Sequence, residues 1–445
     1  MPAPPPAPAS PAPASAPAAS TASRRAVVLL VVVAALGYFV DIYDLILFGV
    51  VRKPSLAALG VAEADMLAEG ERLVRWQMGG LLLGGFLWGV LGDRRGRLSV
   101  LFGSIITYSL ANLANAYVTD LDQYAALRFL AGIGLAGELG AGITLVSEVM
   151  GRHHRGWGTT VVATVGICGG VVAALVGGKV AWRTAYLIGG GLGVALLVLR
   201  LGVRESGMFV AARASTARRG AFLDLFTDRG RLRRYLAIIL VGVPIWYAVG
   251  ILIFFSAEIG RALGVRPGPV PGQALLWCYA GLAVGDLASG VLSQWTRSRR
   301  RALALFLGLT VVAIDLYFMI GGHSRTTFYA CCALLGVATG YWAVFVSTAA
   351  EQFGTELRAT VTTTVPNVVR GAVVPLTFAY EALRGPLGIV TGALVLGAVV
   401  VALAVVALRS LDETFGKDLD YLEGASNPRR DARGGDLPPA ATLRP

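Results

Sequence analysis

Charged side chains are scarce in this sequence. Asp, Glu, Lys and Arg together make up 15% of its 445 residues, whereas hydrophobic residues make up 55%. A soluble domain carries roughly 25% charged residues, because polar groups must cover much of its surface. The shortage excludes an ordinary soluble domain and indicates a chain whose outer solvent is lipid.

Cysteine and histidine are also rare, at four and three residues. The cysteines lie in apolar runs, where a thiol behaves as a small hydrophobic side chain, and no histidine has metal ligands clustered beside it. The glycine-rich stretch 132–142 lacks the Lys-Ser/Thr pair of a phosphate-binding loop, so its glycines indicate close helix packing. The sequence thus predicts no cofactor and no metal, argues against ATP-driven transport, and offers no nucleophile and base for an intramembrane enzyme.

Long apolar runs take the place of these features. A helix that spans the lipid core needs about 20 mostly apolar residues, and the runs are too continuous for the alternating strands of a barrel. The predicted fold class is an all-α integral membrane protein with two six-helix bundles. About twelve runs supply its helices: 26–50, 74–92, 98–116, 123–150, 157–179, 182–201, 234–258, 274–296, 301–321, 327–349, 359–383 and 386–408.

Basic residues are unevenly distributed between the loops. If the N-terminus is cytoplasmic, Lys and Arg fall about twice as often in the loops on that side as in those on the other. This is the positive-inside pattern, and it accounts for the net charge of +12 without a nucleic-acid partner. We therefore expect a multi-pass protein of the inner or plasma membrane with both termini cytoplasmic.

Polar segments divide the chain. Residues 1–23 are rich in Pro, Ala and Ser and are expected to be disordered. The longest internal polar segment, 204–233, is the predicted cytoplasmic central loop. It separates a first bundle at 24–203 from a second bundle at 234–408, and a cytoplasmic tail at 409–445 follows.

The two bundles share sequence features in the same order. The stretch GVLGDRRGR, which begins at Gly89, has a partner in GVLSQWTRSRRR, which begins at Gly290. SEVMGRHHRG has a partner in AEQFGTELRA, and in each a glutamate precedes an arginine by seven positions. The constant order and offset indicate parallel repeats related by an axis along the membrane normal.

The first repeated stretch resembles a family motif. It matches the G-x-x-x-D-R-x-G-R-[RK] signature of the major facilitator superfamily, with Leu98 in place of the last basic residue. The segment DETFGKDL resembles the P-E-T-K-G segment of sugar-porter-like members, and AEQFGTELR their E-x-F-P-x-x-x-R pattern. The resemblance covers about residues 24–420. It implies the major facilitator fold, with twelve transmembrane helices in two pseudo-symmetric six-helix bundles, and a transporter that works by alternating access at a site between the bundles.

The same resemblance implies a cytoplasmic gate. The motif aspartate would accept hydrogen bonds from a helix N-terminus of the other half, where the helix dipole favours an acid. The alternative is that the basic loops serve membrane orientation alone. The predicted gating residues are Gly89, Asp93, Arg94, Gly96, Arg97, Glu148, Arg155, Glu351 and Arg358.

Charged residues inside the runs of the first half predict proton coupling. Asp41 and Asp44 are three positions apart and share a helix face, and two close, buried carboxylates raise each other's proton affinity. Their spacing resembles the D-G-x-D of aromatic-acid/proton symporters, with Ile42 in the place of Gly. Arg128 opens an R-F-x-x-G-x-G pattern of the superfamily, which implies pairing with a carboxylate of the first helix, and Glu138 completes the predicted set. A fixed structural ion pair is the alternative interpretation.

Polar residues inside the runs of the second half are candidate substrate contacts. Asp286 has no acidic counterpart in the first repeat. Arg370 follows Pro366, which we expect to kink its helix. Its guanidinium suits a substrate carboxylate, and pairing with Glu381 or another acid of the chain is the alternative. Aromatic residues here either line a cavity or belong to an interfacial belt. The predicted substrate-binding set is Asp286, Asn367, Arg370, Tyr247 and Trp342.

These features predict a secondary active transporter of a small organic solute, with an organic acid favoured and proton symport as the mechanism. A sugar transporter, a drug/proton antiporter and a facilitative uniporter are alternatives of the same class. A membrane sensor that keeps the fold without moving a solute is the alternative from another class. The expected partners are the solute, protons and the lipid bilayer, and we expect a monomer.

Overall fold

A computed structural model describes residues 24–95, 97–138, 140, 142, 155–204 and 224–417, which form helices and turns and no strand. The first half contains α1 (Arg24–Ala58), α2 (Met66–Arg95), α3 (Arg97–Asn115), α4 (Leu121–Leu135), α6 (Arg155–Gly177) and α7 (Trp182–Arg204). The second half contains α9 (Asp224–Thr227), α10 (Arg229–Tyr247), η1 (Ala248–Ile253), α11 (Ser256–Ala262), α12 (Pro271–Trp295), α13 (Arg299–Met319), η2 (Gly321–His323), α14 (Arg325–Thr339), α15 (Trp342–Glu351), α16 (Thr355–Gly371) and α17 (Val373–Arg409). The all-α prediction is confirmed.

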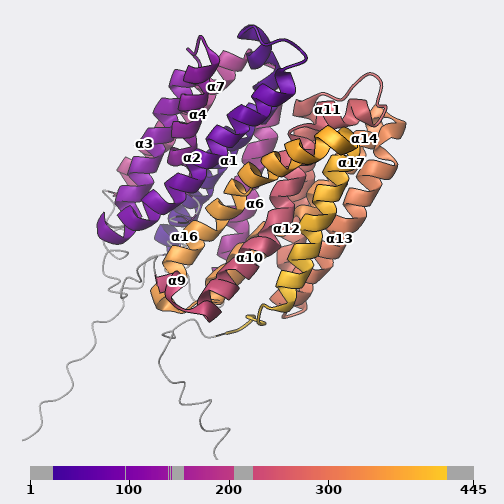
Figure 1. Ribbon diagram of the computed structural model, residues 1–445. Helices are drawn as coiled ribbons and strands as arrows, with labels where there is room; N and C mark the ends of the chain where they lie inside the picture. Colours follow the sequence, from indigo (N-terminus) through magenta and orange to yellow (C-terminus); the bar gives the residue numbers. More distant parts are fainter. Residues whose placement is uncertain are drawn as a thin grey trace, which may run out of the picture.

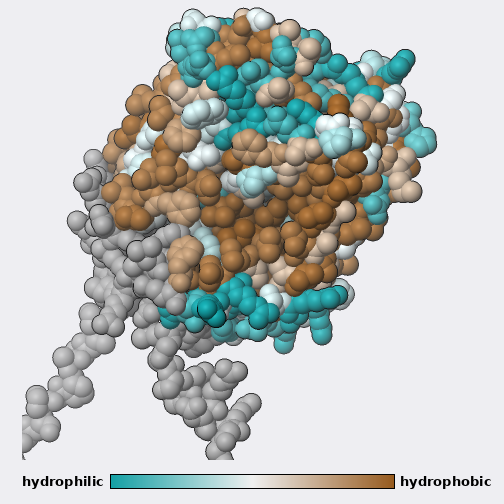
Figure 2. Space-filling model, in the orientation of Figure 1, coloured by the Kyte–Doolittle hydropathy of each residue, from teal (hydrophilic) through white to brown (hydrophobic). Residues whose placement is uncertain are grey.

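Eight helical segments of the described residues are long and apolar enough to cross a membrane. The last of them, Thr360–Arg409, contains two of the predicted runs, and Gly388 with a φ of 80° lies near their junction. Leu110, Val198 and Val406 are each at least 60% exposed, as expected for side chains in contact with lipid. Figure 2 shows the corresponding apolar band between two polar ends. The chain is therefore a multi-pass membrane protein.

The helices form two groups that lie side by side (Figure 1). In the first group α2 packs against α4, and in the second α12 packs against α14. Both contacts depend on glycine, because a Cβ on Gly132 would collide with the backbone of Gln77, and one on Gly336 with the backbone of Cys278. The two pairs occupy corresponding places in the two sequence repeats, so the repeat is visible in the packing.

The two groups meet along α6 and α12 and along α2 and α16. We call the end where α1 begins and α17 ends the near end, which is the lower end in Figure 1, and the opposite end the far end. Three of the helix interruptions in the second group lie close together. The α10 helix continues into the π-helical η1, α14 and α15 are separated by Gly340 and Tyr341, and α16 ends at Gly371, beyond Pro366. These interruptions surround the cavity described next.

Candidate functional site

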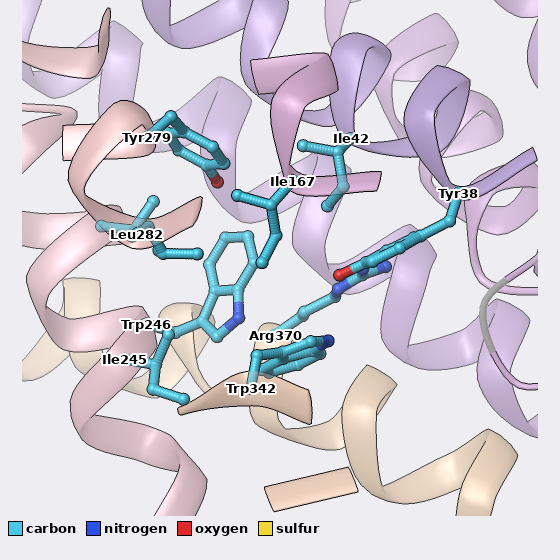
Figure 3. A pocket seen from close by; sticks show the side chains of 10 residues that line it. Tyr38, Ile42, Ile167, Ile245, Trp246, Tyr279, Leu282, Trp342 and Arg370 are labelled. Atoms are coloured by element: carbon cyan, nitrogen blue, oxygen red, sulfur yellow. The ribbon is translucent and has the colours of Figure 1, made fainter. Parts of the chain in front are cut away.

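A cavity lies between the two helix groups. Its wall is apolar and aromatic, and Arg370 is the one charged residue among the described residues that line it. Figure 3 shows the aromatic rings and Arg370 converging on the same space. The lining residues are Tyr38, Ile42, Ile167, Ile245, Trp246, Val249, Tyr279, Leu282, Trp342 and Arg370.

Arg370 joins the two groups through an ion pair. Its Nη1 donates to Asp41 Oδ2 at 3.1 Å, and both side chains are fully buried. Its Nη2 donates to the hydroxyl of Tyr38 at 3.4 Å. The guanidinium carbon lies 5.7 Å from the ring centre of Tyr38 and 5.6 Å from that of Trp342. Glu381 pairs with Arg75, and the alternative interpretation, in which Arg370 pairs with an acid of the chain, is met by Asp41 of α1.

Arg128 and Asp44 are two further charged residues that are buried in the first group. Arg128 sits between the rings of Phe48 and Tyr186, at 5.1 and 5.7 Å from their centres. Its three guanidinium nitrogens and both carboxylate oxygens of Asp44 have no hydrogen-bond partner among the described residues. The predicted pairing of Arg128 with a carboxylate of α1 is thus not formed as a salt bridge here, although both groups are buried.

Glu138 belongs to a satisfied ion pair and is not among the residues that line the cavity. Its carboxylate accepts from Arg200 at 2.7 and 2.9 Å and from Ser104 Oγ at 3.0 Å. Arg200 was not predicted as the partner of Glu138, because it lies at the end of an apolar run and resembles an orienting cation of the next loop. All hydrogen bonds of this pair stay within the first group.

The predicted substrate-binding residues separate into two sets. Arg370 and Trp342 line the cavity. Asn367 donates to the carbonyls of Ala136 and Thr363, and Tyr247 donates to the carbonyl of Ala393 at 2.6 Å. Asp286 accepts from the backbone N–H of Ala343. None of these last three is among the lining residues.

Two lining aromatics, Tyr38 and Tyr279, were not predicted from the sequence, whereas Trp246 is one of the aromatic residues that either line a cavity or belong to an interfacial belt. Tyr38 lies three positions before Asp41, one turn earlier in α1. Helical periodicity around Asp41 is the signal that could have identified it. Tyr279 comes from α12 and Trp246 from α10, and no pattern in the sequence says which face of these helices meets the cavity.

The predicted gating residues are only partly within the described part of the chain. Gly96 and Glu148 lie outside the described residues, and so do the side chains of Asp93, Arg94, Arg97 and Arg155. A Cβ on Gly89 would lie 4.0 Å from Thr364 of the second group. Glu351 accepts from Arg299 at 3.1 and 3.2 Å, and Arg358 donates to backbone carbonyls of Ala350 and Phe353.

The far end carries ion pairs that the sequence analysis did not predict. Each joins a residue of the first half to one of the second half. They are Arg52 with Glu258 at 2.8 Å, Glu71 with Arg384 at 2.8 Å, Arg75 with Glu381 at 2.7 Å, and Glu63 with Arg261 at 3.1 Å. Arg52 and Glu71 are fully buried.

Known proteins resemble the chain over most of its length. It is 27% identical over 320 residues to the 3-(3-hydroxy-phenyl)propionate transporter of Escherichia coli, a match that covers 68% of this chain and 77% of the relative. It is 25% identical over 376 residues to the gentisate transporter of Corynebacterium glutamicum, which covers 80% of this chain and 81% of the relative.

A solved structure shares the fold. The proton:xylose symporter XylE, bound to 6-bromo-6-deoxy-D-glucose, matches with a TM-score of 0.66 over 90% of this chain and 98% of that one, at 15% identity. The family model of the Major Facilitator Superfamily matches residues 34–375. Because this match spans most of the chain, the protein belongs to the major facilitator superfamily of membrane transporters.

Proposed function

We propose that the chain is a proton-coupled symporter of small aromatic carboxylic acids. The observation that carries the proposal is the Asp41–Arg370 ion pair beside an aromatic cavity between the two helix groups. Arginine binds carboxylates through two parallel hydrogen bonds, and the one carboxylate that it contacts here belongs to a residue that can itself take up a proton.

Asp41 and a substrate carboxylate would compete for the same guanidinium. With Asp41 ionised, the charge of Arg370 is compensated. Protonation of Asp41 would leave Arg370 as a buried, uncompensated cation, a state that costs several kcal/mol. A substrate anion removes that cost, so the proton and the anion bind together. The loaded site then has the same net charge as the empty one, which favours its movement between the two faces of the membrane.

The side chains that line the rest of the cavity have the chemistry to contact an aromatic ring. Tyr38, Trp246, Tyr279 and Trp342 offer ring faces and edges for stacking. The named substrates of the two relatives, gentisate and 3-(3-hydroxy-phenyl)propionate, are acids of this kind.

Asp44 and Arg128 have a supporting role in this scheme. Asp44 lies one turn closer to the far end than Asp41 and, like Arg128, lacks hydrogen-bond partners among the described residues. We assign it to proton transfer between Asp41 and the far end, with Arg128 stabilising its ionised form. Glu138 is satisfied by Arg200 and is assigned a structural role.

We place the protein in the inner or plasma membrane as a monomer, with the near end and both termini in the cytoplasm. The support is the excess of Lys and Arg in the loops of the near end. Transport then proceeds by rocking of the two helix groups about the cavity, and no catalytic step is needed.

Uptake by proteoliposomes tests the proposed function. Purified protein is reconstituted, and accumulation of gentisate, 3-(3-hydroxy-phenyl)propionate and xylose is measured with and without an imposed inward proton gradient. We expect gradient-driven accumulation of at least one acid and none of xylose. Uptake of xylose would favour the sugar transporter. Equilibration of an acid without a need for the gradient would favour a uniporter, and gradient-driven extrusion of a solute would favour an antiporter. Binding without any transport would favour the sensor. Each of these results contradicts the proposal.

A further inference from the structure

Asp286 lies behind the cavity wall. Its helix, α12, supplies Tyr279 and Leu282 to the lining, but Asp286 itself is fully buried outside it. Its Oδ1 accepts a hydrogen bond of 2.7 Å from the backbone N–H of Ala343, and its Oδ2 has no partner in the described part of the chain. No salt bridge to Asp286 is present among the described residues, so its contact with backbone requires an explanation.

This contact falls at the break between α14 and α15. The first helix ends at Thr339 and the second begins at Trp342. The start of a helix has backbone N–H groups without intrahelical partners, and a side-chain acceptor there stabilises the helix end. The chain also approaches α12 closely at this point, because a Cβ on Gly340 would lie 2.6 Å from backbone atoms of Gly285 and Asp286. Residues 285–286 therefore fix where α15 begins.

The residue at the beginning of α15 is Trp342. Its ring lines the cavity and lies 5.6 Å from the guanidinium carbon of Arg370. Its indole nitrogen is buried and has no hydrogen-bond partner in the described part of the chain. Figure 3 shows the indole beside Arg370 at one side of the cavity. A displacement of the start of α15 would move the ring of Trp342. The cavity would then lose a stacking surface, and Arg370 would lose the ring that lies beside its guanidinium.

We propose that Asp286 is a positioning residue, which holds Trp342 and thereby Arg370 in the geometry that binds the solute. Asp286 acts by accepting the hydrogen bond from Ala343, and it neither touches the solute nor carries the coupled proton. This inference rests on the proposed function, since it concerns the affinity of the same cavity. If the inference holds, asparagine at position 286 should position Trp342 as well as aspartate does, because its amide oxygen accepts the same hydrogen bond.

Transport kinetics in proteoliposomes test the assignment with gentisate as the probe, or with 3-(3-hydroxy-phenyl)propionate if that is the transported acid. We expect Asp286→Ala to raise KM about tenfold, the order expected for loss of a hydrogen bond at a helix start, with kcat changed less than twofold and gradient-driven accumulation retained. Asp286→Asn should restore KM to within about twofold of the wild type. Asp315→Ala is the matched control, because Asp315 is an exposed acid in α13 of the same group.

A double-mutant cycle links the effect to the indole. We expect Trp342→Phe to raise KM, and the addition of Asp286→Ala to raise it little further, because both changes disturb the same contact. In the absence of solute, Asp286→Ala should shift the tryptophan emission that Trp342→Phe removes, whereas Asp286→Asn should not. If Asp286→Ala is not recovered as folded protein, Asp286→Leu, which has a similar shape and no acceptor, replaces it.

Two results would overturn the inference while leaving the proposed function intact. An unchanged KM for Asp286→Ala would exclude a positioning role. Loss of gradient-driven accumulation in Asp286→Asn, with solute exchange retained, would make Asp286 a proton carrier. If the wild type transports neither acid, the proposed function fails independently of this inference. The tryptophan emission of Asp286→Ala, compared with that of Asp286→Asn, still decides whether Asp286 positions Trp342.

Discussion

The two ends of the molecule use buried ion pairs differently. At the far end, Glu71 and Arg384 join α2 to α17, and Arg52 and Glu258 join α1 to α11, so these pairs bridge the two helix groups. At the near end, the described pair of Arg299 and Glu351 lies within the second group. A pair between groups opposes their separation, whereas a pair within a group only stabilises that group. Buried ion pairs at the two ends therefore have different consequences for transport: those at the far end hold the two groups together, and the described pair at the near end does not.

The largest expected effect comes from breaking a far-end pair. Arg384→Ala leaves the carboxylate of Glu71 fully buried without its partner at 2.8 Å. Loss of one partner of a buried pair costs about 3 kcal/mol, and this cost falls mainly on the conformation in which the far end is closed. We expect a broader and longer distance distribution between spin labels at the far-end positions Ala58 and Thr326.

Arg325→Ala is the matched control for this measurement. Arg325 also lies at the far end, but its side chain donates to Tyr329 of its own helix at 3.2 Å. We expect its distance distribution to match that of the unsubstituted labelled protein. An equal shift in both variants would show that the pairing of Glu71 with Arg384 does not hold the far end closed.

Breaking the near-end pair should lower stability without opening the far end. Glu351 accepts hydrogen bonds from Arg299 and from Thr414 Oγ1. Glu351→Gln weakens charge-assisted hydrogen bonds that are worth about 1.5–3 kcal/mol each, so we expect a lower Tm in detergent and unchanged spin-label distances. A far-end shift as large as that of Arg384→Ala would instead support the gating role that the sequence pattern predicts for Glu351.

A fall in pH should affect the two ends differently, and we expect this effect to be smaller than those of the substitutions. A hydrogen bond from Arg261, aided by the charge of Lys53, lowers the pKa of the exposed Glu63 at the far end. At the near end, burial raises the pKa of Glu413, but hydrogen bonds from Ser298 and from backbone N–H groups outweigh it, so its pKa is also lowered. Both contacts are complete above the ordinary value of 4.5 and are lost as the pH falls through the lowered pKa.

Two measurements at each pH test this difference: the distances between the same spin labels, and the Tm of the protein in detergent. As the pH falls from about 6 through the lowered pKa of Glu63, we expect the Glu63–Arg261 contact to weaken and the far-end distances to lengthen slightly. Loss of the Glu413 contacts should only lower Tm. Glu63→Gln should remove the pH response of the distances, and a full response in that variant would assign it to another group.

The sequence predicted the helices and the main charged residues, but not their partners. The apolar runs follow from the thickness of a bilayer, so the helices were accessible from composition and length. Asp41 and Arg370 were identified because charge inside an apolar run is costly. Their contact joins residues 329 positions apart, and only the packing of the two groups brings them together. The same is true of Glu138 and Arg200.

The position of Asp286 shows a second limit. A lone acid near the middle of a helix predicts a functional role, but the face on which it lies depends on how α12 packs against α14. The break at Gly340 and Tyr341, where the carboxylate accepts from Ala343, has no clear signal in a run that contains other glycines. The sequence therefore indicated an unusual residue without indicating its contact.

The most direct test of proton symport through the Asp41–Arg370 pair compares accumulation with exchange in Asp41→Asn. Proteoliposomes with this variant are assayed for gradient-driven accumulation of the acid that the wild type transports, and for exchange of labelled against unlabelled acid, with Asp315→Asn as the control. We predict that accumulation is lost and exchange is retained, because Arg370 still binds the anion while the titratable partner is gone. Accumulation at the wild-type level would contradict the account.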